Sequence, residues 1–153
     1  MRPHLAFLGP LAAAIALVPV VVLAAADPMA TVHQFIDGFN TGNVASALAA
    51  CGPQTEIIDE FAPYEWHGNA ACGRWAAAYG ANAKKNGVTD GIVTLAKPSS
   101  IETSGDRAYV VVPAQYRFKV RGKVMAEHGA TMTFALEKRD GWRIRAWSWS
   151  KHL

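Results

Sequence analysis

Two long runs of alternating side chains in the C-terminal half of the chain constrain its fold most. Successive side chains of a β-strand point to opposite faces, so an apolar residue at every second position predicts a strand with one apolar face. Such faces comprise Val110, Val112, Ala114, Tyr116, Phe118 and Val120, then Val124, Ala126, His128, Ala130, Met132, Phe134 and Leu136. We expect antiparallel strands over 107–120 and 124–138, and another over 142–151.

Helical patterns come before these strands. Asp27-Pro28 is a typical helix start, because the aspartate accepts from a free backbone N–H and proline suits the first helical turn. Asn43 is expected to cap a second, shorter helix, and Asn69 a third that ends at Gly87. Helices that precede an antiparallel sheet predict a single α+β domain over 27–153, with the sheet curved around the helices.

The first 26 residues have the pattern of a secretory signal peptide. A short basic start precedes an uncharged stretch from Leu5 to Ala26, and Ala24-Ala25-Ala26 offers a cleavage site of small residues. The pattern predicts a secreted or periplasmic protein. The alternative is a retained anchor, since the stretch is nearly long enough to span a bilayer, and membrane contact would then involve this segment alone.

Two cysteines, Cys51 and Cys72, lie outside that segment. In an oxidising compartment an even pair favours a disulfide, which would tie the segment before Asp59 to the third helix. The alternative is two small buried side chains that never meet. Neither cysteine has the spacing of a zinc ligand, so we expect no metal site.

Basic residues gather toward the end of the chain without forming a patch. Residues 107–153 hold ten Lys and Arg against three Asp and Glu, whereas 27–106 hold four against nine. Several of the basic residues, such as Arg117, Lys119 and Arg121, occupy alternate strand positions, which is typical of a solvated sheet face. A nucleic-acid binder usually clusters them with aromatic platforms, so we expect no nucleic-acid partner.

Asp59 is the first candidate for chemistry. It lies in an apolar, β-branched segment, 55–61, that predicts a strand with Ile57, Asp59 and Phe61 on one face. If that face points inward, Asp59 is a carboxylate among apolar neighbours, which raises a pKa and suits a general acid or base. The alternative is a structural aspartate bonded to nearby backbone.

His128 is the second candidate, because it is the only polar residue on its apolar strand face. A three-residue turn over 121–123 would pair Val120 with Val124 and set Tyr116 opposite His128. We therefore predict Tyr116 and His128 as neighbours on the concave face, where polar groups beside Asp59 would indicate an open pocket. The alternative is a histidine whose hydrogen bonds are satisfied within the core.

The last strand separates small from large side chains. Ala146 and Ser148 share one face and would leave room for a ligand if they point inward. Trp147 and Trp149 would then lie on the outer face among cations. Exposed tryptophans there predict a homodimer through the outer sheet face, or else rings that pack beneath long basic side chains.

The order of elements and several short motifs resemble the nuclear-transport-factor-2-like (NTF2-like) superfamily, including its ketosteroid isomerase-like and SnoaL-like branches. The motifs are Phe35-Ile36-Asp37-Gly38-Phe39-Asn40-Thr41-Gly42-Asn43, Ile57-Ile58-Asp59, Trp66-His67-Gly68 and Gly141-Trp142-Arg143-Ile144. The resemblance extends from about Asp27 to His152. It implies a conical half-barrel with a deep pocket between the helices and the sheet.

The isomerase's catalytic set is only partly present. Its general-base aspartate falls on Asp59, its tyrosine donor on Phe35, and its second acidic donor near Thr131, so two of the three groups are missing. Phe35 and Trp66 remain candidates to line the pocket, and Tyr64 could supply a donor or pack its ring on the loop.

Two functions follow from these residues. The first is an exported pocket protein that binds a small hydrophobic molecule. The second is a cofactor-independent isomerase, lyase or cyclase that uses Asp59 as acid or base, with His128 and Tyr116 on the substrate oxygen. No nucleotide or metal motif is visible, so neither function needs a cofactor.

Overall fold

The computed structural model describes residues 27–151, and all structural statements below concern that range. The helices are α1 (Pro28–Asn40), α2 (Val44–Ala49) and α3 (Ala71–Asn86), and the strands are β1 (Cys51–Ile58), β2 (Glu65–Trp66), β3 (Val88–Leu95), β4 (Ser100–Ser104), β5 (Arg107–Val120), β6 (Lys123–Arg139) and β7 (Gly141–Ser150). The predicted signal peptide, residues 1–26, lies outside the described residues. No helix within 27–151 is long and apolar enough to cross a membrane.

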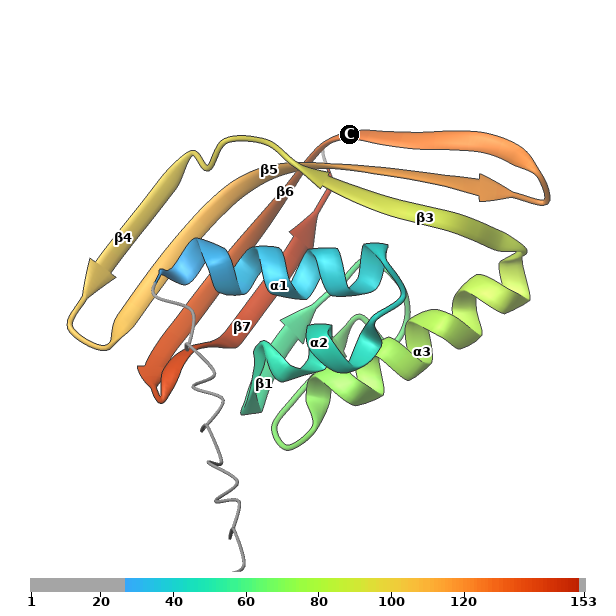
Figure 1. Ribbon diagram of the computed structural model, residues 1–153. Coiled ribbons are helices and arrows are strands. Elements are labelled where there is room, and N and C mark those ends of the chain that lie inside the picture. The colour runs from blue at the N-terminus through green and yellow to red at the C-terminus, as the bar shows by residue number, and fades with distance from the viewer. Residues whose placement is uncertain (1–26, 152–153) are drawn as a thin grey trace, which may run out of the picture.

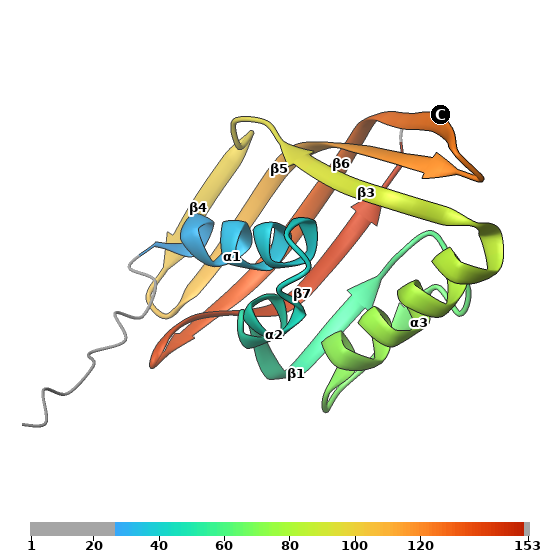
Figure 2. The same ribbon diagram turned by 45° about the vertical axis from the view of Figure 1, so that its right-hand side comes forward.

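One curved sheet runs through the molecule and the helices lie along its concave side (Figures 1 and 2). Its strand order is β2-β1-β7-β6-β5-β3, and β4 also pairs with β5. Only β1 and β7 run parallel; the other neighbours are antiparallel. The α+β prediction, with helices first and a curved and mainly antiparallel sheet after them, is confirmed.

The helix starts follow the local sequence in two cases of three. The Asp27 side chain accepts from the Met29 N–H at 2.7 Å, and Asn43 accepts from the Ser46 N–H at 3.1 Å. The predicted Asn69 cap is wrong, because α3 begins after Ala70, which adopts a left-handed backbone and makes no side-chain cap. Gly87 ends α3 with a φ of 68°, as expected of a glycine there.

The core fills the space between α1, α3 and the concave face of the sheet. Its largest fully buried side chains are Phe35, Phe134, Ile57, Leu136, Ile144, Val32, Val110, Val112, Thr31 and Thr55. Met29, Val32, Phe35 and Ile36 of α1 are all buried and form the side of this helix that packs into the core.

The disulfide prediction agrees with the structure. Cys51 at the start of β1 is bonded to Cys72 in the first turn of α3. The bond therefore joins the strand that leads to Asp59 with the helix that packs beside it.

The predicted pairing of Tyr116 with His128 is wrong. The turn between β5 and β6 has two residues, Arg121 and Gly122, both with positive φ, so Val120 pairs with Lys123. A bulge then restores the predicted register beyond it, where Ala114 pairs with Ala130. Within the bulge His128 is exposed and bound to Gln115 at 2.7 Å.

Glu127 takes the inward place that the sequence predicted for His128. Tyr116 pairs with Glu127 because β6 carries one residue more than β5 between the two matched segments. Gly129 lies in this bulge with a φ of 73°, a backbone conformation that glycine adopts without steric cost. One extra residue therefore exchanges a histidine for a carboxylate on the concave face.

A second bulge corrects the prediction for the last strand. Leu136 pairs with Ile144 but Ala135 pairs with Ala146, so Arg145 is the extra residue and the alternation reverses after it. Trp147 is consequently buried on the concave side and Ser148 is not, contrary to the prediction. Trp147 and Trp149 line the cavity, so they do not support the predicted dimer through the outer sheet face.

Candidate functional site

A cavity of about 260 Å³ lies between α1, α3 and the concave face of the sheet. Its inner part, which we call the floor, includes the buried side chains Phe35, Met132 and Trp147. Its outer part, which we call the rim, includes the partly exposed Ala83 and Phe118. Nine aromatic side chains line the cavity: Phe35, Phe39, Phe61, Trp75, Tyr79, Tyr116, Phe118, Trp147 and Trp149.

These rings pack in two groups that a hydrogen bond between the Tyr79 and Tyr116 hydroxyls joins. Trp75 packs edge-on against Trp147 at 4.8 Å between ring centroids and stacks on Tyr79 at 5.7 Å. Phe35 contacts Trp147 at 5.6 Å, and Tyr116 stacks on Phe118 at 4.6 Å. Such clusters hold their rings in fixed positions, so the cavity wall is largely pre-formed.

Asp59 lies on the cavity wall immediately after β1. Its Oδ2 accepts from the indole N–H of Trp75 at 2.7 Å, and its Oδ1 accepts from the backbone N–H of Glu60 at 2.7 Å. Burial raises the pKa of the Asp59 carboxyl, and those two hydrogen bonds oppose the rise by stabilising the charged form. The predicted position of Asp59 among apolar neighbours is therefore observed.

A second set of charged groups lies beside Asp59. Lys151 bonds to Glu60 at 2.6 Å and lies 3.4 Å from Glu127, whose other oxygen accepts from the indole N–H of Trp149 at 2.8 Å. Burial raises the pKa of Glu60, and the bond to Glu60 raises the pKa of Lys151. The network joins the end of β1 to β6 and β7.

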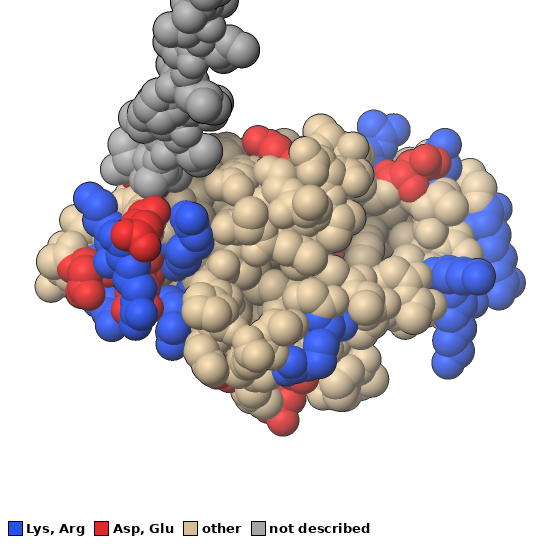
Figure 3. Space-filling view, turned by 60° about the horizontal axis from the view of Figure 1, so that its bottom comes forward, with Lys and Arg blue, Asp and Glu red and all other residues tan. Residues whose placement is uncertain are grey.

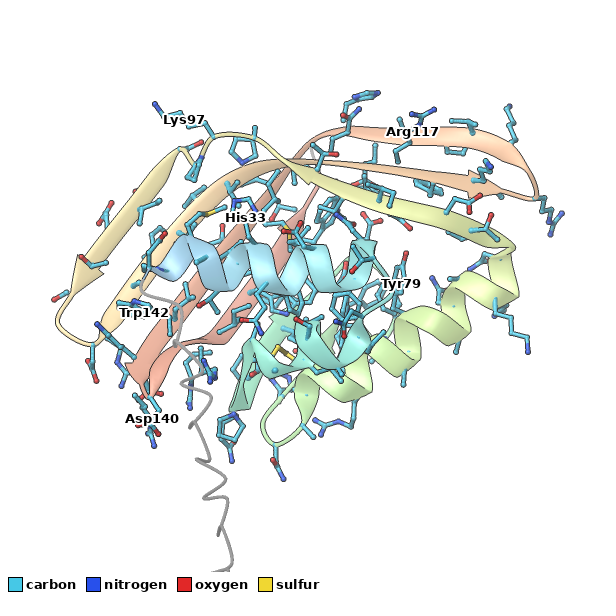
Figure 4. The ribbon with its side chains drawn as sticks, viewed as in Figure 1. His33, Tyr79, Lys97, Arg117, Asp140 and Trp142 are labelled. Carbon is cyan, nitrogen blue, oxygen red and sulfur yellow. A yellow bond between two sulfur atoms is a disulfide. The ribbon has the colours of Figure 1, made fainter. Side chains whose placement is uncertain are left out.

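Two phenols meet across the cavity. The hydroxyls of Tyr79 on α3 and Tyr116 on β5 are hydrogen-bonded to each other, and Tyr79 projects from its helix toward the sheet (Figure 4). Burial raises the pKa of both, so both remain protonated at neutral pH. Because one proton suffices for the bond between them, the pair retains a second hydroxyl proton that can be donated to a ligand oxygen.

Two hydrogen bonds from one side chain fix the position of β3, the strand next to Tyr116. The Asn40 side chain at the end of α1 donates to the Val93 carbonyl at 2.7 Å and accepts from the Val93 N–H at 2.9 Å. Gly91 on the same strand leaves room for Tyr116, since a Cβ there would lie 2.6 Å from the phenol oxygen. Asn40, Gly91 and Val93 therefore shape the side of the cavity that β3 forms.

The structure brings together only some of the side chains singled out from the sequence. Asp59, Phe35 and Tyr116 line the cavity. The others lie outside its lining: His128 is exposed, Ser148 lies on the far side of β7, Tyr64 is 59 % exposed, and Trp66 is buried in β2 against Phe61.

Sequence reasoning missed several cavity residues. Trp75 and Tyr79 recur at helical spacing on α3, and nothing in the helical period distinguishes a packed ring from one beside a cavity. Glu60, Glu127 and Trp149 were placed on outer faces because strict alternation was assumed through two bulges and a strand end. Gly129 in the alternating run was the available signal for the first bulge.

No cluster of three or more His, Cys, Asp or Glu side chains within residues 27–151 is arranged to hold a metal ion. The lining offers hydrogen-bonding side chains at Asp59, Glu60, Asn40, Asn82 and the two phenols, and is otherwise mainly apolar and aromatic. The site can therefore hold an uncharged or cationic organic molecule by burial and a few directed hydrogen bonds.

No protein-family model and no curated protein matches the sequence. Solved structures do match it. A ketosteroid isomerase-like protein from Erwinia carotovora atroseptica superimposes with a TM-score of 0.66 at 16% identity, covering 84% of this chain and 95% of its own. An NTF2-like superfamily protein from Salmonella enterica gives a TM-score of 0.66 at 14% identity, covering 81% of this chain and 87% of its own.

An NTF2-like protein of unknown function from Pseudomonas putida is a further match, with a TM-score of 0.59 at 13% identity over 80% of this chain and 82% of its own. At such identities the likeness concerns the backbone and not the activity. It covers most of the chain, including the helices and the curved sheet described above. The chain therefore has the NTF2-like fold, with ketosteroid isomerase-like proteins among its structural neighbours.

Proposed function

We propose that this protein binds a small, mainly apolar ring compound in the cavity between α1, α3 and the sheet. The observation that carries the proposal is an open space of about 260 Å³ surrounded by nine aromatic side chains. A cavity of about 150 Å³ holds benzene, and drug-sized ligands occupy about 300 Å³ or more. A ligand of two fused rings fits between these limits.

Binding of 2-naphthylmethanol tests the proposal directly. Titration calorimetry should give a dissociation constant between about 10 µM and 1 mM, a range expected for a ligand of this size. Ala83→Trp places a large ring at the rim and should abolish binding, whereas Ala81→Trp, on an exposed position of the same helix, should leave it unchanged. Equal affinities in the two variants, or none in the wild type, would refute the proposal.

A proton-transfer enzyme is the second candidate, and Asp59 is the observation that favours it. Its carboxylate lies on the cavity wall with a raised pKa, and the Tyr79–Tyr116 pair offers a hydroxyl proton in the same cavity. In this function Asp59 takes a proton from carbon beside a carbonyl, the phenol pair donates to the resulting enolate oxygen, and the proton returns to carbon.

Hydrogen exchange separates the two candidates. An enzyme of this kind should exchange the acidic C–H protons of 2-tetralone with deuterium oxide, detected by NMR, and Asp59→Asn should abolish the exchange while still binding 2-naphthylmethanol. Exchange that persists in Asp59→Asn would contradict a role for this carboxylate. Absence of exchange in the wild type, together with binding, would favour the pocket protein.

We also propose that the protein is exported. The support is the apolar N-terminal segment with its small-residue cleavage site and the Cys51–Cys72 bond, which an oxidising compartment favours. Mass spectrometry of protein produced from the full chain in a bacterial host should show loss of 26 residues and two hydrogens. An intact N-terminus would contradict the proposal.

A further inference from the structure

The charged side chains that line the proposed binding cavity are all acidic. Its nineteen lining residues include two carboxylates, Asp59 and Glu60, and no Lys, Arg or His. In the view of Figure 3, most Lys and Arg side chains gather at two ends of the molecule, and the surface between them is mainly uncharged, with one smaller basic group and a few acidic atoms in its lower part. Charge inside the cavity therefore favours a cation and disfavours an anion.

The two carboxylates differ in how their charge is balanced. Glu60 has Lys151 at 2.6 Å, whereas Asp59 receives only uncharged donors, the indole of Trp75 and the backbone N–H of Glu60. Glu127 lies close by and shares the same lysine. Lys151 is thus the one nearby cation for Asp59, Glu60 and Glu127 among the described residues. It contacts the two glutamates directly, and Asp59 on the cavity wall has no direct cationic partner.

A half-buried charge without a counter-charge is costly, and a bound cation would supply what is missing. The charges near Asp59 act in both directions: Glu127 adds to burial in disfavouring its ionised form, and Lys151, which bonds to Glu60 instead, offsets part of this effect. A ligand cation beside Asp59 would reverse that balance by favouring the carboxylate.

The surrounding rings point to the same chemistry independently. The faces of Trp, Tyr and Phe rings carry partial negative charge and attract cations within about 6 Å of the ring centre. Three tryptophans, Trp75, Trp147 and Trp149, and the phenols Tyr79 and Tyr116 line the cavity. Aromatic walls with a carboxylate at one side form a site suited to a protonated amine on an apolar body.

We propose that the ligand of this cavity is an organic monocation, a protonated amine carried by a small ring system, with its ammonium at Asp59 and its rings among the tryptophans. The proposal rests on the ligand-binding function above and adds the charge of the ligand. It excludes carboxylate ligands of the same shape, because an anion would meet Asp59 and Glu60 with no cation in the lining.

Three probes of one ring system test the charge. They are 2-naphthylmethylammonium, 2-naphthylmethanol and 2-naphthoate, titrated calorimetrically at low ionic strength and at pH 8, well above the ordinary pKa of an aspartate. The cation should bind at least about tenfold more tightly than the alcohol, and the carboxylate more weakly than either. Raising the salt concentration should narrow the gap between cation and alcohol only in part, because the pair is shielded from solvent.

A matched pair of variants locates the effect. Asp59→Asn should bring the affinity for the cation down to that for the alcohol, about a tenfold loss, with the alcohol little changed. Asp140→Asn removes the same charge from the opposite end of the sheet, well away from Tyr79 (Figure 4), and should preserve the preference for the cation.

The outcomes distinguish this inference from the proposed function. If the alcohol binds as tightly as the ammonium, the protein binds ring compounds but the inferred cation preference is wrong. If none of the three probes binds, both the inference and the binding function are refuted. A cation preference that survives Asp59→Asn would also overturn the inference, because it would come from another part of the molecule.

Discussion

The indole N–H of Trp75 donates a 2.7 Å hydrogen bond to Oδ2 of Asp59, so a residue of α3 holds the carboxylate that follows β1. The bond fixes the direction of the carboxylate while leaving it on the cavity wall. The Cys51–Cys72 disulfide joins the same strand and helix farther back along the chain. Covalent and hydrogen-bonded links thus position one acidic group.

Trp75→Phe should raise the pKa of Asp59 further. The indole hydrogen bond favours the ionised carboxyl, and its loss leaves burial less opposed. The free energy of unfolding at pH 7 should also fall by about 2 kcal/mol, a usual cost of losing a hydrogen bond to a charged group. NMR titration of the Asp59 carboxyl carbon measures the pKa, and Trp142→Phe, at the opposite end of the sheet in Figure 4, should leave it unchanged.

Asp59→Asn should remove a dependence of stability on pH. Because burial raises the pKa of Asp59 in the folded state, the folded protein binds that proton more tightly than the unfolded chain. Stability from this group is therefore greatest below the unfolded pKa, falls as pH rises toward the folded pKa, and stays low above it. The variant lacks this titration but also loses one accepted hydrogen bond, so its stability relative to the wild type should be lowest at acidic pH and should improve as the pH rises to 7, measured by thermal unfolding. A difference that does not change with pH would contradict this explanation.

The paired substitution Cys51→Ala and Cys72→Ala should lower the free energy of unfolding by about 3 kcal/mol, as expected for a closed loop of this length. Urea unfolding measures the loss. The wild type in reductant should behave like the double variant, and the double variant should not respond to reductant. A wild type that is alkylated on both thiols without reductant would show that the bond is absent.

Gly91→Ala should damage the cavity wall. Its Cβ would lie 2.6 Å from the Tyr116 phenol oxygen, so the ring must move and its bond to Tyr79 must break. Overpacking of this kind costs about 1–3 kcal/mol, and the affinity for 2-naphthylmethanol should fall with it. Gly80→Ala, in open space on α3, should instead gain about 0.5–1 kcal/mol and keep its affinity. Similar behaviour of the two variants would disprove the close contact.

Alternation in the long strands and the start and end signals of the helices were sufficient to predict the α+β architecture. Alternation arises from burial of one strand face, and the helix signals from free backbone groups at helix ends, so both are local properties of each element. The disulfide followed from an even cysteine pair and its compartment. The partial burial of Asp59 was expected from its apolar neighbours, but the predicted strand over 55–61 was wrong, because β1 ends at Ile58 and Asp59 follows it.

The composition of the cavity could not be predicted equally well, because it depends on register. A single additional residue in β6 exchanges His128 for Glu127, and Arg145 in β7 exchanges Ser148 for Trp147. Strict alternation assigns side chains to the wrong face of the strand beyond a bulge. Of the two bulges, only the one in β6 has a signal in the sequence, Gly129. Contacts between distant elements, such as Tyr79 with Tyr116, leave no pattern in the sequence at all.

The five tryptophans allow the central claim, that the cavity binds a ring compound, to be measured directly. The side-chain N–H signals of all five should be followed by NMR while 2-naphthylmethanol is added. Trp75, Trp147 and Trp149 line the cavity, whereas Trp66 and Trp142 are buried outside its lining. The three cavity signals should shift and saturate together while the other two stay fixed. Absence of any shift, or shifts led by Trp66 or Trp142, would contradict ligand binding in this cavity.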